Sequence, residues 1–333
     1  MTWLAWRQHR GESAAAALLL AVLALVVLPS GLHLHQLEGT LNIGHCQGAT
    51  PGAGCATAFD AFNATSRSLS GIVPWLNLLP GLAGAFIGAP LVAREMEEGT
   101  WRLAWSQGVT RRRWLRAQLV ATFGVVVLAT ILFTIVVTWW LAPLNHIDGR
   151  FASNGHGFDF YGMVPAAWAL LALAIGVLAG TVARRVVPAV AITFGAYLAI
   201  RLPVEFLLRP RYLPPVKLWG VEPSNVHPLG PNNWVFSQDL VAPHSHHILS
   251  ATQQDLVQRI AQAASPKPKN SGQDVQYLAS LAHYLQTHGY TYAFTYQPAG
   301  RFWIFQGIET GICLVLALLA VAATCWWVSR RLT

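Results

Sequence analysis

Charged residues are scarce in this sequence. Asp, Glu, Lys and Arg make up 11% of its 333 residues, whereas hydrophobic residues make up 54%. An ordinary soluble domain carries about 25% charged residues. A soluble protein also does not hold several apolar stretches of about 20 residues with hardly a charge among them. The composition therefore excludes an ordinary soluble protein and predicts an all-α polytopic membrane protein.

Lysine is scarcer still, with only Lys217, Lys267 and Lys269 among the 22 basic residues. A phosphate-binding P-loop needs a lysine directly after a glycine, and none of these three follows one. The sequence also lacks Gly-x-Ser-x-Gly and His-Glu-x-x-His motifs and a convincing pair of catalytic acids. We therefore expect no catalytic residues and no enzyme activity in this chain.

Acidic residues number 14 against 22 basic ones, which gives a formal net charge of +8. Such a balance can indicate nucleic-acid binding. Many arginines, however, stand beside apolar stretches, among them Arg7, Arg10, Arg184 and Arg185. The positive-inside rule places basic residues there in membrane proteins. We therefore expect the lipid bilayer, and no nucleic acid, as a partner.

Cysteine is also rare, and of the four cysteines Cys46 and Cys55 share one polar loop. A disulfide between them is conceivable if the loop faces an oxidising compartment; two free thiols are the alternative, and both stay open. Residues 244–247 read His-Ser-His-His. Zinc ligands are usually spaced on defined elements, which this segment does not offer, so we predict a solvated loop and no metal.

Six apolar stretches are long enough to cross a bilayer as helices. The arginines of the short connecting segments place both chain ends in the cytoplasm of a multi-pass plasma-membrane protein. The cytoplasmic segments are too short for a nucleotide-binding domain. Five spans are predicted in a membrane domain (1–208), at about 13–32, 72–93, 115–141, 163–183 and 186–208, and a sixth at about 302–328 within a C-terminal part (301–333).

Two spans have distinctive compositions. The second contains Pro74, Pro80 and Pro90 and is rich in glycine. Such a helix can bend and lets a neighbouring backbone approach closely. The third ends in Trp139-Trp140, which we interpret as part of an aromatic belt at the membrane interface.

The segment 209–300 is predicted to be a mainly helical extracellular region, irregular in its proline-rich first half. Ser250 and Gln253 form a capping-box pattern for a helix that runs to about Ala264. A similar pattern, Ser271 with Asp274, opens a second expected helix that ends before Gly289. The alternation over 290–296 predicts a strand or extended segment.

A cytoplasmic hairpin, residues 94–114, connects the second and third spans. Gly99 is placed to end the incoming helix, and Thr100 to cap a short helix whose Trp101 and Trp105 share one face. Glu97 and Glu98 fall at a helix C-terminus, where they oppose the macrodipole by roughly 0.3–1 kcal/mol. Arg111, Arg112 and Arg113 fall at a helix N-terminus, which is equally unfavourable. Pairing between these glutamates and arginines, lipid phosphates or a docked protein would have to favour the arrangement. We interpret the hairpin as a docking element; an interfacial helix with ordinary flanking charges is the alternative.

The hairpin carries a family resemblance. Its Glu-x-x-x-Gly-Thr, followed by Arg-x-x-Trp-Leu, resembles the coupling region of type-2 ATP-binding-cassette (ABC) export permeases. The run 296–309, Tyr-Gln-Pro-Ala-Gly-Arg-Phe-Trp-Ile-Phe-Gln-Gly-Ile-Glu, resembles the actinobacterial branch of those permeases. The resemblance implies a coupling helix, a separate ATPase subunit that binds ATP and Mg, and a second permease copy, identical or paralogous. It places ATPase docking on Glu95, Glu97, Glu98, Gly99, Thr100, Trp101, Arg102 and Trp105.

Three charged residues lie within predicted spans: Arg201 and Glu205 at i, i+4 in the fifth, and Glu309 in the sixth. Charges at such depth are costly and usually face the bundle interior. We predict that they form an intramembrane polar cluster. Two roles remain open: a gate at the outer end of a pathway, or an ion pair that pins helices together.

Two other functions also remain open. A secondary transporter would need ionisable relays near the bilayer midplane and an internal repeat, and no clear repeat is present. A membrane-anchored sensor or binding protein would bind a ligand through residues 209–300 and would need no pathway.

Overall fold

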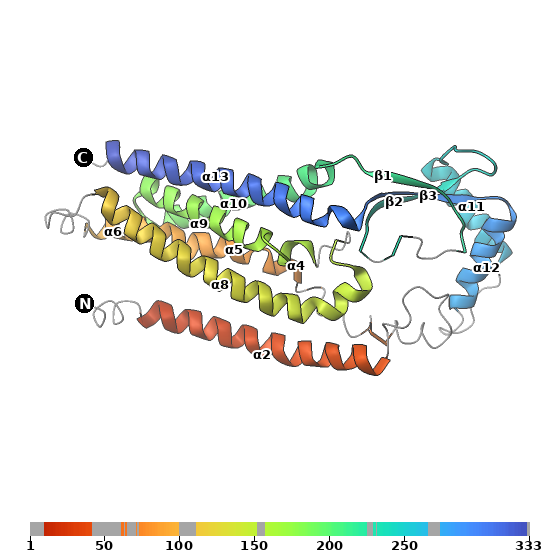
Figure 1. Ribbon diagram of the computed structural model, residues 1–333, viewed down its shortest axis with the longest axis horizontal. Coiled ribbons are helices and arrows are strands. Elements are labelled where there is room, and N and C mark those ends of the chain that lie inside the picture. The colour runs from red at the N-terminus through yellow and green to blue at the C-terminus, as the bar shows by residue number, and fades with distance from the viewer. Residues whose placement is uncertain are drawn as a thin grey trace.

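The computed structural model describes residues 10–41, 61, 62, 64, 71, 73–99, 111–151, 157–224, 229, 230, 232–265 and 274–331. Long helices lie side by side in a bundle, and a small sheet with two helices extends beyond one end of it (Figure 1). We name this end of the bundle the sheet end. The opposite end, where both ends of the chain lie, is the terminal end.

Within the described residues, five helices are long and apolar enough to cross a membrane, and each overlaps one of the last five predicted spans. The first predicted span falls within α2 (Arg10–Leu41), and its crossing of the membrane remains a prediction. The predominantly helical fold is confirmed. The five stretches are Val73–Glu98, Gln118–His146, Val164–Ala183, Val186–Arg211 and Ala299–Arg330.

The first of these stretches is broken into short pieces, as its prolines and glycines predict. It consists of α4 (Val73–Leu76), α5 (Leu79–Ala83), the π-helical η2 (Gly84–Gly88) and α6 (Ala89–Glu98). Pro80 lies in the first turn of α5, where its missing N–H costs nothing. Pro90 directly follows the π-helical turn, and the backbone stays helical from η2 into α6.

The remaining spans are single helices, apart from a change of helix type near the end of one. They are α8 (Arg111–Asp148), α9 (Val164–Ala183), α10 (Val186–Pro203) and α13 (Phe302–Arg331). The π-helical η4 (Val204–Leu208) and the 3-10 turn η5 (Arg209–Arg211) continue α10. A 3-10 turn, η3 (Phe158–Phe160), precedes α9.

Glycines bring η2 and α9 into backbone contact, as the composition of the second span predicts. A Cβ added to Gly176 would lie 2.2 Å from the carbonyl oxygen of Gly84, and one added to Gly84 would lie 2.3 Å from that of Ala172. Gly180 approaches the carbonyl of Ala89 in the same way. Only glycine fits such positions, so α9 is the helix against which the broken span packs.

The interpretation of Trp139-Trp140 as an interfacial belt is wrong. Trp140 is buried, and its Nε1 donates to Oγ of Ser30 on α2 at 3.0 Å. The Trp139 ring stacks on His35 of the same helix. The indole N–H of Trp140 and the ring face of Trp139 therefore both find partners on α2 and hold it against α8.

Beyond the sheet end, three strands form an antiparallel sheet in the order β1-β3-β2. The strand expected at 290–296 is confirmed as β3 (Thr291–Gln297), and the two expected helices as α11 (Ala251–Ala264) and α12 (Asp274–Thr287). The expectation of an irregular first half is wrong: β1 (Val216–Val221) and β2 (Trp234–Val241) flank β3. Their prolines lie outside the strands, where they do not disturb the ladder.

Candidate functional site

Four charged side chains meet in the interior at the sheet end of the bundle. Asp159 comes from η3, Arg201 from α10, Arg209 from η5 and Glu309 from α13, and each residue is at most 6% exposed. Two positive charges therefore balance two negative ones. We call these four residues the charge cluster. It joins three segments that are far apart in the sequence.

Arg209 makes directed hydrogen bonds to both carboxylates. Its Nε and Nη2 donate to Oε2 and Oε1 of Glu309, each at 2.8 Å. Its Nη2 and Nη1 also donate to Oδ1 and Oδ2 of Asp159, at 2.6 and 3.3 Å. The guanidinium lies over the Phe158 ring, with 4.4 Å between Cζ and the ring centroid. Bidentate, charge-assisted bonds of this kind are the strongest that arginine forms.

Arg201 is held more by charge than by directed bonds. Its Nη2 lies 2.7 Å from Oδ1 of Asp159 and its Nε 3.2 Å from Oε2 of Glu205, but neither contact has hydrogen-bond geometry. Its Nη1 donates to Oε1 of Glu309 at 3.4 Å. The guanidinium also lies over Trp168, with Cζ 4.7 Å from the ring. Glu205 lies beside the charge cluster and is partly exposed, with a quarter of its side chain accessible.

The π-helix η4 places Arg201 and Arg209 on one side of the chain. Eight residues of an α-helix, at about 3.6 residues per turn, exceed two turns by about a quarter turn. The wider i→i+5 turns of η4 take up this excess. Pro203 stands directly before η4 and has no N–H to bond in an α-helical ladder. The sequence thus brings both arginines to the same carboxylates through a local change of helix type.

The two arginines of the charge cluster lower the pKa of Asp159. Burial alone would raise it, but the positive charges of Arg201 and Arg209 and their hydrogen bonds lower the pKa to about 2. Asp159 is therefore ionised at any physiological pH, and its charge needs both arginines close by.

The structure brings the three predicted residues, Arg201, Glu205 and Glu309, together. The prediction missed Asp159, Arg209 and Trp168, whose Nε1 donates to Oε1 of Glu309 at 2.8 Å. Arg209 could have been found because it repeats the i, i+4 step from Glu205. Asp159 gives no local signal beyond its place between two phenylalanines, since only the tertiary fold brings η3 to α10.

The run 296–309 forms the joint between the sheet and the bundle. Oε1 of the buried Gln306 accepts from the N–H groups of Met163 and Val164, at 3.2 Å each, so that α13 caps the N-terminus of α9. Nη1 of Arg301 donates to Oε1 of Gln297 at 2.6 Å and to the carbonyl of Pro214 at 2.7 Å. Arg301 and Gln306 of this joint thus each hold another segment in place.

The hairpin 94–114 is described at its two bases. Gly99 has φ 72° and ends α6 after Glu98, as predicted. Glu95 accepts from Nε2 of Gln118 on α8 at 3.0 Å, and Glu98 pairs with Arg94 at 3.1 Å. Thr100, Trp101, Arg102 and Trp105 lie outside the described residues, so their docking role remains a prediction.

Glu97 has a partner that the sequence did not suggest. Its Oε2 accepts from the N–H of Val186, the first residue of α10, at 3.0 Å. The carboxylate therefore lies at the positive end of another helix, which offsets its unfavourable place at the end of α6. This contact links the hairpin to the turn between α9 and α10.

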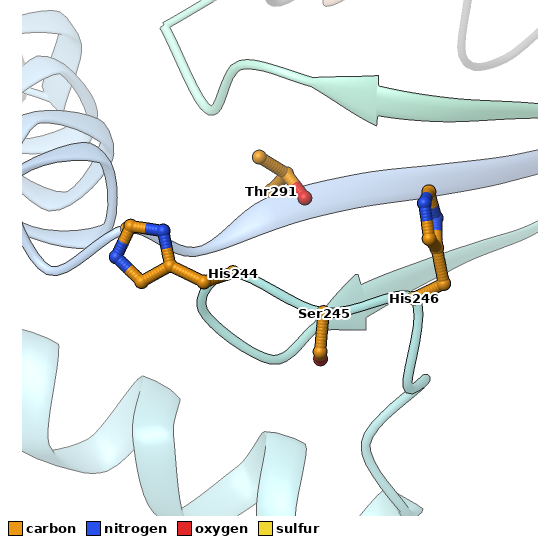
Figure 2. A pocket seen from close by; sticks show the side chains of 5 residues that line it. His244, Ser245, His246 and Thr291 are labelled. Atoms are coloured by element: carbon orange, nitrogen blue, oxygen red, sulfur yellow. The ribbon is translucent and has the colours of Figure 1, made fainter.

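Residues 244–247, which we call the histidine loop, follow β2. A cavity of about 290 Å³ is lined by His244, Ser245, His246, Gly289 and Thr291. Figure 2 shows the rings of His244 and His246 at opposite ends of the turn, with Ser245 pointing away from Thr291. Among the described residues, no three His, Cys, Asp or Glu side chains converge as metal ligands would. Cys46 and Cys55 lie outside those residues, and their pairing stays open.

Comparison with known proteins gives one match. A family model described as ABC-2 membrane transporter related matches residues 17–209. This range contains the second to fifth predicted spans of the membrane domain and most of the first, the hairpin, and Asp159, Arg201 and Arg209. No curated protein and no solved structure matches the chain.

Proposed function

This chain belongs to the ABC-2 membrane transporter related family, and from that premise we propose that it is the permease subunit of an ABC exporter. The family consists of membrane components of ABC transporters, and an ABC ATPase is their general partner. We propose that here a separate ATPase binds ATP and Mg, docks on the hairpin 94–114, and drives the helices between inward-open and outward-open states.

The observation that carries this proposal is the position of the hairpin bases. α6 ends and α8 begins at the terminal end of the bundle, opposite the sheet (Figure 1). Glu95 joins these two helices through Gln118, and Glu97 joins α6 to α10. A partner that displaced this hairpin would therefore move three helices at once. We take the terminal end as cytoplasmic and the membrane as the plasma membrane, in accordance with the positive-inside rule.

We further propose that two copies of the chain, or one copy and a paralogue, enclose the pathway. Apolar side chains cover the exposed faces of α8 and α13, among them Leu128, Ile135, Leu314 and Leu318. Such faces meet lipid or a second bundle. The sheet with α11 and α12 stands at the sheet end, where it would lie at the exit of a pathway between the two copies.

Co-purification with a candidate ABC ATPase tests the docking assignment. Replacing both Trp101 and Trp105 by Ala removes the apolar face of the predicted coupling helix and should reduce the recovered ATPase at least tenfold. The matched control replaces Trp75 and Trp303, which are 70% and 56% exposed near the sheet end, and should leave the yield unchanged. Equal recovery with both double variants would refute docking at this hairpin.

The same experiment separates the two other functions that the sequence leaves open. A secondary transporter or a sensor that binds a ligand through residues 209–300 needs no ATPase. Neither would recover an ATPase with the unaltered chain.

A further inference from the structure

The N-terminus of α10 lacks a cap of its own. The residue before it, Arg185, has extended backbone angles and no side-chain bond to the helix. An arginine has donors and no acceptor, so it cannot serve a helix N-terminus. Within the helix, Pro188 has no N–H and the N–H of Ala189 donates to the carbonyl of Arg185 at 3.2 Å. The N–H groups of Val186 and Val187 are therefore left for acceptors from outside the helix.

Glu97 on α6 is the acceptor for Val186, at 3.0 Å. α6 and α10 also contact each other beside this bond. Ala89 and Ala93 of α6 pack with Ala189 of α10, and Val186 packs against the same group. These short side chains bring the backbones close enough for a glutamate to reach from one helix to the next. The bond thus completes an existing interface.

We propose that Glu97 is a positioning residue that caps α10 from α6 and so carries a displacement of the hairpin 94–114 into α10. This rests on the proposed function for the origin of the displacement. At its other end α10 leads to Arg201 in the charge cluster. The helix therefore connects the hairpin at the terminal end with the joint at the sheet end.

This role differs from direct contact with an ATPase, to which the sequence assigned Glu97. A carboxylate that binds a partner through its charge loses that binding when it becomes a neutral glutamine. A carboxylate that accepts a backbone hydrogen bond keeps most of its effect, because the glutamine side chain also has a carbonyl oxygen. Glu97→Gln and Glu97→Ala therefore separate the two roles.

Hydrogen exchange of the purified chain in lipid nanodiscs, without ATPase, measures the cap directly. Glu97→Ala should speed exchange of the Val186 amide about fivefold, in accordance with the loss of one helix cap. Glu97→Gln should exchange within about twofold of the unaltered chain. The control is Glu98→Ala, which removes an exposed pair with Arg94 and should leave the amide unaffected. Unchanged exchange in Glu97→Ala would overturn the proposal.

A second pair of variants tests the consequence for coupling. Val186→Pro deletes the donor while keeping a residue favoured at the first helical position, and the extended Arg185 tolerates a following proline. In the complex with the ATPase, Glu97→Ala and Val186→Pro should each reduce ATP hydrolysis about fivefold with unchanged co-purification. The double variant should fall no further. Additive losses, or ATPase binding lost equally in Glu97→Ala and Glu97→Gln, would overturn the proposal.

The two experiments separate this inference from the proposed function. A faster-exchanging Val186 amide in Glu97→Ala supports the cap even if no ATPase docks. Docking abolished by the double tryptophan variant supports the proposed function even if the cap is refuted.

Discussion

Arg209 and Glu309 form a bidentate ion pair at the sheet end of the bundle, with both nitrogen–oxygen distances at 2.8 Å. The chain between them contains the sheet, α11 and α12, so this one pair joins the two ends of that segment. Glu309 is fully buried. A pair so placed is costly to break, because the remaining charge has no water to solvate it.

Replacing Arg209 by Met should lower the free energy of unfolding by about 3–5 kcal/mol. The variant leaves Asp159 and Glu309 to share Arg201, whose contacts are less directed. Thermal unfolding of the detergent-solubilised chain, followed by size-exclusion chromatography, measures the loss. The control Arg211→Met removes an exposed arginine that donates to the carbonyl of Leu207, and should cost less than about 1 kcal/mol.

The balance of charges in the cluster predicts that a second substitution restores stability to Arg209→Met. The double variant Arg209→Met with Glu309→Gln leaves Arg201 between the buried Asp159 and the partly exposed Glu205. The one remaining fully buried carboxylate then keeps a cation beside it, so the variant should regain at least half of the lost stability. A double variant as unstable as the sum of the two single variants would contradict the balance. The same protein decides between the two roles of the cluster: retained transport indicates a pin, and folded protein without transport indicates a gate. The mutual pairing of all four charges favours the pin.

Acid should weaken the cluster only below about pH 4. The folded pKa of Asp159 is about 2, below the ordinary value of about 3.9. Its contribution, about 2–3 kcal/mol, is therefore present above pH 4 and is lost as the pH falls towards 2. Unfolding midpoints between pH 7 and pH 2.5 measure it. Asp159→Asn should be less stable at pH 7 and should show a shallower fall below pH 4. An equal fall in both proteins would assign the acid sensitivity to other carboxylates.

Much of the bundle could be predicted because membrane-spanning helices have a simple sequence pattern. Apolar length gives the spans, and glycine marks the close approach of η2 and α9. The sheet could not be predicted in full, because β1 and β2 are short strands between prolines and loops. Strand pairing over such distances depends on tertiary contacts more than on local preference.

Two of the four residues of the charge cluster, Arg201 and Glu309, can be predicted from the sequence. The other two cannot, because their positions depend on tertiary contacts. Arg201, Glu205 and Glu309 are conspicuous because they interrupt apolar helices. Arg209 falls at a span end, where arginine is ordinary, and Asp159 lies in a short turn. Likewise, Glu97 looks misplaced within α6 alone, and its role emerges only when the N-terminus of α10 lies beside it.

The backbone contact of η2 with α9 should not tolerate a side chain. Gly176→Ala would place a Cβ 2.2 Å from the carbonyl oxygen of Gly84, and should cost about 1–3 kcal/mol through displaced helices. Gly195→Ala on α10 is the control, since nothing lies within 4 Å of its added Cβ. That variant should be neutral or gain up to about 1 kcal/mol from helix propensity. Equal thermal stability of the two variants would contradict the close packing.

The most direct test of the account is photo-crosslinking in membranes that contain the chain and a candidate ABC ATPase. A photoreactive amino acid at position 101 reports on the hairpin, and one at position 303, at the sheet end, serves as the control. The account predicts an ATPase adduct from position 101 and none from position 303. An adduct from position 303 alone, or from neither position while the ATPase co-purifies, would contradict docking at the hairpin.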